Sequence, residues 1–184
     1  THTSRCGHAV GTDEEYVQAA IQGGLKTLGF SDHAAYGKSR RTDRMDLEQF
    51  PEYMTSINAL REKYKDQITI YLGTEIECYP EELPLLTEYR KKLDYCILGQ
   101  HSLNLDDDRT YFATKPEELE IYVSRLEYAC AHNLCDYICH PDVVLWSYPV
   151  MDEAVRTCAK QIAAISKKYN MPLELNTGSG VHHG

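Results

Sequence analysis

The chain has 184 residues, of which 42% are hydrophobic and 26% charged, which is the composition of an ordinary soluble globular protein. We expect residues 1–184 to form one domain. The net charge of −9 argues against broad binding to a nucleic-acid backbone, and no run of about 20 apolar residues predicts a membrane helix. Seven irregularly spaced cysteines without a CxxC motif predict reduced thiols in a cytoplasmic protein, and we expect several of them, including Cys135 and Cys139, in the core.

The first predicted elements are a helix and a buried strand. Thr12 is followed three residues later by Glu15, which is a capping pattern, and a pair of glycines ends the helix that follows. The apolar run at 25–33 predicts a buried strand that ends in polar side chains. A polar loop at 34–46 and a helix at 46–65 follow.

The clearest strand is ITIYLGTEIE at 68–77, which is rich in β-branched and aromatic residues. The remaining elements alternate in the same way: a helix at 81–92, a strand at 93–102, a loop at 104–110, a helix at 115–133, a strand at 135–142, a helix at 151–169 and a last strand at 171–180. Short apolar strands that alternate with amphipathic helices predict an α/β fold with a parallel sheet or a barrel.

Four potential metal ligands share one position in this repeating unit, at or just past the C-terminal end of a predicted strand. They are His33, Glu75, His101 and His140. In a parallel barrel these strand ends meet on one face, where active sites lie. Imidazole and carboxylate are ligands for Zn, Mn or Fe, and a carboxylate such as Glu75 can bridge two ions in phosphoryl displacement. We therefore expect these four residues to bind metal.

The other histidines allow different interpretations. His2 and His8 precede any element long enough to be a helix or a strand, so they indicate either a loose polar tail or part of a metal site. His132 stands at a predicted helix end and is expected to be a solvated or capping residue. His182 and His183 are expected to belong to a disordered tail.

Two further groups of polar residues flank the proposed ligands. A cationic cluster follows SDH and consists of Lys38, Arg40, Arg41 and Arg44. We interpret it as a solvated loop face, with phosphate recognition by Arg40 and Arg41 as the alternative. Asp32 and Asp142 lie beside proposed ligand histidines and are candidates to orient an imidazole.

Five segments occur in the order found in the PHP (polymerase and histidinol phosphatase) superfamily: THTSRCGHA at 1–9, GFSDH at 29–33, GTEIE at 73–77, GQHS at 99–102 and CHPD at 139–142. The chain resembles this superfamily over nearly its whole length, and most of all its histidinol-phosphate phosphatases. The resemblance implies a distorted seven-stranded (β/α) barrel with two or three divalent metal ions at the C-terminal ends of the strands.

The resemblance also implies a role for each ligand. His2 would belong to the first metal, Glu75 would bridge the first and second metals, and His101 and His140 would complete the second. A third metal would be held by the two remaining histidines of the motifs, His8 and His33. The first histidine of the family's opening His-x-His would precede Thr1, and its Asp-x-His would follow Gly184. The expected fold is thus a PHP barrel without its first strand and last βα unit.

The residues and the resemblance together predict a metal-dependent phosphomonoesterase of histidine biosynthesis that converts L-histidinol phosphate to histidinol and phosphate. A metal-bound hydroxide would attack phosphorus, and Glu75, His101 and His140 would be the catalytic residues. The expected partner is a small-molecule phosphate ester, with no nucleic acid or membrane. Two alternatives remain open: a PHP hydrolase for another phosphate ester or a phosphopeptide, and a degenerate, non-catalytic metal-binding domain.

Overall fold

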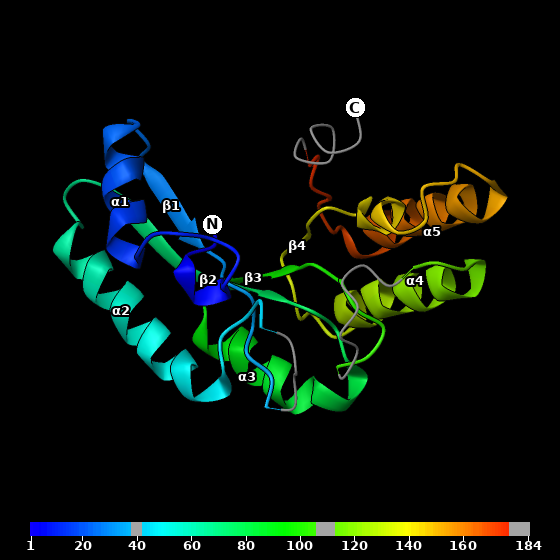
Figure 1. Ribbon diagram of the computed structural model, residues 1–184, viewed down its shortest axis with the longest axis horizontal. Helices are drawn as coiled ribbons and strands as arrows, with labels where there is room; N and C mark the ends of the chain where they lie inside the picture. The colour runs from blue at the N-terminus through cyan, green and yellow to red at the C-terminus, as the bar shows by residue number, and fades with distance from the viewer. Residues whose placement is uncertain (38–41, 106–112, 177–184) are drawn as a thin grey trace.

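A computed structural model describes residues 1–37, 42–105 and 113–176 of the chain. Its centre is a parallel sheet of four strands in the order β1-β2-β3-β4. The strands are β1 (Thr27–Phe30), β2 (Thr69–Ile76), β3 (Tyr95–Leu98) and β4 (Tyr137–Ile138). Because neighbours in the sheet are also neighbours in sequence, each strand returns to the sheet through a helical connection (Figure 1). The predicted parallel α/β architecture is confirmed.

The helices flank this sheet. They are α1 (Asp13–Gln22), α2 (Phe50–Lys63), α3 (Leu83–Lys92), α4 (Pro116–Ala131) and α5 (Glu153–Tyr169), with short 3-10 turns η1 (Ser4–Cys6), η2 (Leu47–Gln49), η3 (Pro80–Glu82) and η4 (Val143–Trp146). The predicted capping box of α1 is present, because the Thr12 hydroxyl accepts from the Glu15 amide and the Glu15 carboxylate accepts from the Thr12 amide. Helices α4 and α5 pack against each other on the side of β4 (Figure 1).

Burial along β2 changes from one end to the other. Thr69 and Tyr71 near the start are exposed and alternate with buried residues, as in a strand with one solvated face. From residue 72 to residue 76 every side chain is buried. The carboxyl end of β2 is therefore enclosed on both faces, and a charged side chain placed there needs partners.

The last predicted strand, at 171–180, pairs with β4 at only one position within its described residues 171–176. In the described part of this segment, Leu173 forms a single parallel bridge with Ile138, and the Ile138 amide donates to the Pro172 carbonyl at 3.0 Å. Two features explain this: β4 is only two residues long, and Pro172 has no amide hydrogen to donate. Residues 177–180 lie outside the described residues.

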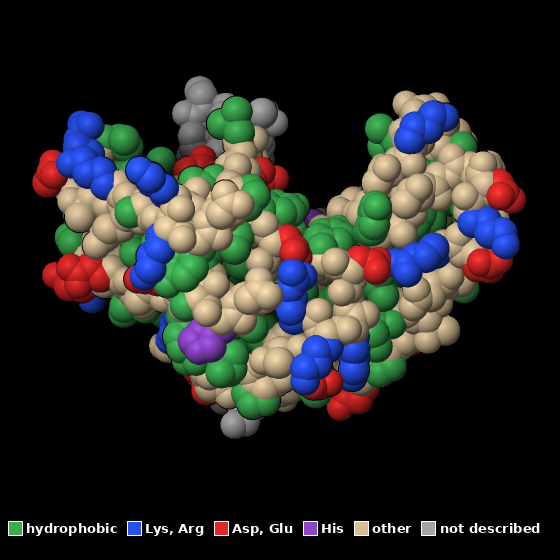
Figure 2. Space-filling view, turned by 180° about the vertical axis from the view of Figure 1, so that it is seen from behind, with side chains coloured by type: hydrophobic (Ala, Val, Ile, Leu, Met, Phe, Trp, Pro, Cys, Tyr) green, Lys and Arg blue, Asp and Glu red, His purple; other side chains and the backbone are tan. Residues whose placement is uncertain are grey.

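The surface mixes charges of both signs. On the face shown in Figure 2, Lys and Arg side chains are interspersed with Asp and Glu, so the described residues there form no broad basic patch. None of the helices in the described ranges combines the length and the apolar character that a membrane span requires.

Candidate metal centre

The site is built around Glu75, near the carboxyl end of β2, which is only 3% exposed. Its Oε1 lies 3.0 Å from Nε2 of His140, 3.5 Å from Nε2 of His101 and 4.0 Å from Nδ1 of His33. Its Oε2 lies 3.1 Å from Nε2 of His2. Four histidines from four separate segments thus converge on one buried carboxylate.

Backbone pairing explains why His33 and Glu75 meet. Beyond the end of β1 the chain pairs once more with β2, so that His33 and Glu75 form a parallel bridge. The Glu75 amide donates to the Asp32 carbonyl at 3.1 Å, and the Ala34 amide donates to the Glu75 carbonyl at 2.8 Å. Just past the end of β3, Gly99 leaves the space that the Glu75 carboxylate fills, because a Cβ atom at position 99 would overlap it.

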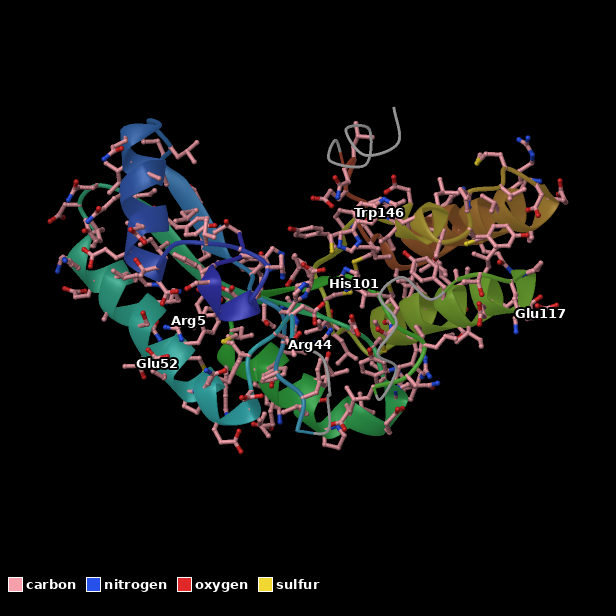
Figure 3. The ribbon with its side chains drawn as sticks, in the orientation of Figure 1. Arg5, Arg44, Glu52, His101, Glu117 and Trp146 are labelled. Carbon is pink, nitrogen blue, oxygen red and sulfur yellow. The ribbon has the colours of Figure 1, made fainter. Side chains whose placement is uncertain are left out.

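The imidazole rings form one continuous cluster. Ring centroids are separated by 4.7 Å for His2 and His33, 5.1 Å for His2 and His8, and 5.2 Å for His8 and His33. The chain of rings continues from His33 to His101 at 5.2 Å and from His101 to His140 at 4.9 Å. Figure 3 shows His101 near the middle of the molecule.

Two of these rings carry nitrogen atoms with unused bonding capacity. Nδ1 of His33 and Nδ1 of His140 are buried and have no hydrogen-bond partner within the described part of the chain. Burial lowers the pKa of His33 to about 3 although Glu75 opposes this shift, so its ring is neutral at pH 7 and offers a lone pair. Burial alone would raise the pKa of Glu75, but the imidazoles around it, two of them hydrogen-bonded to its oxygens, hold that pKa well below its usual range. A carboxylate anion surrounded by imidazoles is the result.

The opening loop that carries His2 and His8 is fixed in place rather than loose. Cys6 is fully buried, and its thiol donates to Oδ1 of Asp32 at 3.1 Å and accepts from the His33 amide at 3.0 Å. Arg5 pairs with Glu52 on α2 (Figure 3). Of the two interpretations of His2 and His8, the structure favours a folded part of the site.

The two aspartates predicted to orient imidazoles occupy different places. Asp32 is buried next to the cluster, and its Oδ1 accepts from the Thr3 amide at 2.7 Å as well as from Cys6, so its hydrogen bonds fasten the loop that carries His2. Asp142 stands at the start of η4 and lines an apolar pocket with Val144. A direct bond from either carboxylate to a ligand imidazole stays a prediction.

One residue of the cationic cluster, Arg44, is buried and not solvated as we expected. The Arg44 side chain is only 2% exposed, and its Nη2 lies 3.2 Å from Oε1 of Glu77. The interpretation is wrong for Arg44 because a buried carboxylate draws the guanidinium inward. The proposed phosphate-binding residues, Arg40 and Arg41, lie outside the described residues, as do Lys38, His182 and His183. His132 is exposed at the end of α4, as predicted.

Sequence reasoning missed two residues at this centre. Glu77 is 1% exposed, and its Oε1 lies 3.0 Å from Nδ1 of His101. Its signal was present in GTEIE, because residues two apart in an extended chain point to the same side. The Cys139 thiol lies 3.3 Å from Nε2 of His140 and groups with that ring and Glu75, so it borders the site as well as being buried in the core.

The comparisons with known proteins agree with this arrangement. A family model described as "PHP domain" matches residues 1–178. The chain belongs to the PHP domain family. A Deinococcus radiodurans protein named "Probable histidinol-phosphatase" is 33% identical over 152 residues, which make up 77% of this chain and 58% of that protein. A Schizosaccharomyces pombe protein of the same name is 34% identical over 110 residues, which make up 54% of this chain and 36% of that protein. The PHP chain thus spans less than two thirds of the length of these relatives.

A solved structure shares the fold. The crystal structure of histidinol phosphate phosphatase from Lactococcus lactis, complexed with zinc, L-histidinol and phosphate, matches with a TM-score of 0.70 at 20% identity. The match covers 96% of this chain and 71% of that one. The similarity confirms the PHP fold class predicted from the sequence.

Proposed function

We propose that this PHP chain belongs to a metal-dependent phosphomonoesterase that hydrolyses L-histidinol phosphate to histidinol and phosphate. The convergence of four imidazoles on the buried carboxylate of Glu75 carries the proposal. The names of the two sequence relatives and the ligands of the Lactococcus lactis enzyme support the choice of substrate. The expected compartment is the cytoplasm.

The residues of the centre fit divalent metal ions. Imidazole nitrogen and carboxylate oxygen suit Zn, Mn or Fe, and Nδ1 of His33 and Nδ1 of His140 lack a partner within the described ranges. A buried polar atom without a partner costs about 1–3 kcal/mol, which coordination would offset. Two or three ions would be held by His2, His8, His33, Glu75, His101 and His140. When bound, such ions lower the pKa of a coordinated water toward about 7 and stabilise charge on phosphoryl oxygens.

The chain's own residues organise the centre for this chemistry. Glu75 supplies the negative charge that can join two ions, and the enclosed end of β2 keeps bulk water away from it. His2 and His140 approach different oxygens of Glu75, at 3.1 Å and 3.0 Å, so they can serve different ions. Recognition of the substrate phosphate by Arg40 and Arg41 stays a prediction outside the described residues.

A substrate screen on the full-length, metal-loaded protein tests the proposal. We expect kcat/KM for histidinol phosphate to exceed that for p-nitrophenyl phosphate and for a phosphoserine peptide by at least about tenfold, a difference of about 1.4 kcal/mol in transition-state stabilisation. Equal efficiency on all three would indicate a broader PHP phosphoesterase. Bound metal without any phosphate release would indicate a non-catalytic metal-binding domain.

A further inference from the structure

Glu77 makes a contact that the proposed chemistry does not yet use. It follows β2, is almost fully buried, and places Oε1 3.0 Å from Nδ1 of His101. The other nitrogen of the same ring, Nε2, lies 3.5 Å from Oε1 of Glu75. The His101 ring is therefore held between two carboxylates, one inside the candidate metal centre and one behind it.

These two distances indicate which nitrogen of His101 carries the proton. A neutral imidazole has one N–H donor and one lone pair, and a carboxylate can only accept. The 3.0 Å contact with Glu77 is a normal hydrogen-bond distance, whereas the 3.5 Å contact with Glu75 is at the outer limit. The proton thus belongs on Nδ1, and the Nε2 lone pair then points at an anionic oxygen. Such an arrangement is favourable when a cation lies between the two.

Both the carboxylate and the backbone of Glu77 make hydrogen bonds with neighbouring side chains. Oε1 accepts from Arg44 at 3.2 Å, and the Tyr79 hydroxyl donates to Oε2. The Tyr36 hydroxyl donates to the Glu77 carbonyl at 2.6 Å and accepts from the Glu77 amide at 2.9 Å. Figure 3 shows Arg44 next to His101. Because backbone and carboxylate are both fixed, Glu77 offers the His101 ring an acceptor in one place.

A comparison with another arginine–carboxylate pair separates this role from a purely structural one. The two terminal nitrogens of Arg90 donate hydrogen bonds to different oxygens of Asp136, both at 2.6 Å. This is the bidentate geometry of a structural arginine–carboxylate pair. Arg44 instead contacts the same Glu77 oxygen that faces His101. A buried ion pair is by itself weak evidence for a stabilising role. Because Arg44 and His101 contact the same oxygen of Glu77, the ion pair holds that oxygen against the imidazole.

We propose that Glu77 is a positioning residue, which holds His101 in the Nδ1–H tautomer so that the lone pair of Nε2 faces Glu75, where it can serve as a metal ligand. The role in metal binding rests on the proposed function. The tautomer of the His101 ring can be measured without metal. Arg44 supports this role by keeping Glu77 in place.

The first experiment reads the tautomer directly. Long-range ¹H–¹⁵N NMR of the metal-free full-length protein in mildly alkaline buffer distinguishes protonated from unprotonated ring nitrogens. We expect the Nδ1–H form of His101 in the wild type and a shift toward the Nε2–H form in Glu77→Gln, whose amide can donate to Nδ1. The control Asp136→Asn, which removes the carboxylate charge from the Arg90–Asp136 pair, should leave the tautomer unchanged. An Nε2–H form in the wild type, or a spectrum unchanged in Glu77→Gln, overturns the inference.

The second experiment measures zinc affinity by competition with a chromophoric chelator. We expect Glu77→Gln to weaken zinc binding about 10–100-fold, the usual effect of removing a partner that orients a ligand, while Asp136→Asn changes it less than about twofold. If Glu77→Gln unfolds because Arg44 loses its buried partner, the double variant Arg44→Gln/Glu77→Gln removes both buried charges and should show the same weakening. Wild-type affinity in either folded variant contradicts the inference. A wild type that binds zinc but releases no phosphate from histidinol phosphate contradicts the proposed function and leaves the tautomer result standing.

Discussion

Both ends of the parallel sheet carry carboxylates, and the two ends use them differently. At the amino end, Asp136 accepts from the Cys96 amide at 2.9 Å and from both terminal nitrogens of Arg90. At the carboxyl end, Glu75 faces four imidazoles and the Cys139 thiol, and two of the surrounding ring nitrogens are buried without partners in the described ranges. The same functional group is saturated at one end and available for a cation at the other.

The amino end repeats one device. An aspartate immediately precedes the tyrosine that begins β3 and β4. Each aspartate accepts a hydrogen bond from one backbone amide of the preceding strand, Asp94 from Leu72 at 2.7 Å and Asp136 from Cys96. An arginine from a helix then pairs with each aspartate, Arg61 in the first case. Carboxylates whose acceptor capacity is filled by amides and guanidinium groups stabilise strand pairing and offer nothing to a metal ion.

Replacing Glu75 at the carboxyl end and Asp136 at the amino end should give the largest difference in kcat/KM between the two ends of the sheet. We expect Glu75→Gln to lower kcat/KM by about 10²–10³-fold, the loss seen when one preorganised electrostatic group is removed, because a neutral amide cannot bridge two cations. Asp136→Asn should keep kcat/KM within about twofold, as is usual for a change away from the chemistry. Steady-state kinetics with saturating zinc on folded variants measures both. Equal losses in the two variants would remove the distinction between the ends of the sheet.

Two glycines allow the same comparison of the two ends of the sheet by adding side-chain volume instead of removing charge. A Cβ at Gly99 would overlap the Glu75 carboxylate, and a Cβ at Gly73, opposite the start of β3, would overlap the Tyr95 ring. We expect Gly99→Ala to displace Glu75 and weaken zinc binding about 10–100-fold. Gly73→Ala should instead cost about 1–3 kcal/mol of unfolding free energy through overpacking, with zinc affinity retained in the folded protein.

Chelator competition and urea unfolding of the metal-free proteins read these two effects separately. The contrast fails if Gly99→Ala loses stability as Gly73→Ala does and binds zinc normally. It also fails if Gly73→Ala, while still folded, loses zinc affinity as much as Gly99→Ala.

The sequence was sufficient to predict the alternating elements and the placement of the ligands. Apolar runs and capping patterns located the four strands of the sheet and the five α-helices, and a shared position at strand ends brought His33, Glu75, His101 and His140 together. This works because parallel strands place their carboxyl ends on one edge whatever the sequence distance between them. In the described part of the last predicted strand, residues 171–176, pairing is limited to one bridge because the neighbouring strand β4 is only two residues long.

The supporting residues were harder to predict because their roles depend on contacts that are distant in sequence. Arg44 looked like part of a solvated cluster, and only the position of Glu77 explains its burial. Glu77 itself could have been found from its two-residue spacing to Glu75, but nothing in the sequence named Tyr36 or Tyr79 as its partners. Hydrogen bonds to a ligand's second nitrogen are set by tertiary packing rather than by a local pattern.

A substitution at the amino end of the sheet should lower the free energy of unfolding even though it leaves the activity unchanged. We expect Asp136→Asn to lower the free energy of unfolding by about 0.5–1 kcal/mol, since Arg90 and Asp136 are partly exposed and asparagine keeps one acceptor for the Cys96 amide. The loss should shrink at high salt because it comes from a screened ion pair. Urea unfolding at two salt concentrations measures it, and a loss that grows with salt contradicts this account.

The smallest effect is expected at a histidine outside both ends of the sheet. His132 is exposed at the end of α4, where Nδ1 lies 2.9 Å from the Tyr128 carbonyl and its ring stacks on Tyr128 with centroids 4.0 Å apart. Nothing in this arrangement reaches Glu75, so His132→Ala should leave kcat/KM and zinc affinity within about twofold and change the unfolding free energy by no more than about 0.5 kcal/mol. Kinetics, zinc competition and urea unfolding on one preparation check all three values. A tenfold loss of zinc affinity in His132→Ala would mean that histidines influence the centre from a distance, and position at a strand end would then no longer separate ligands from bystanders.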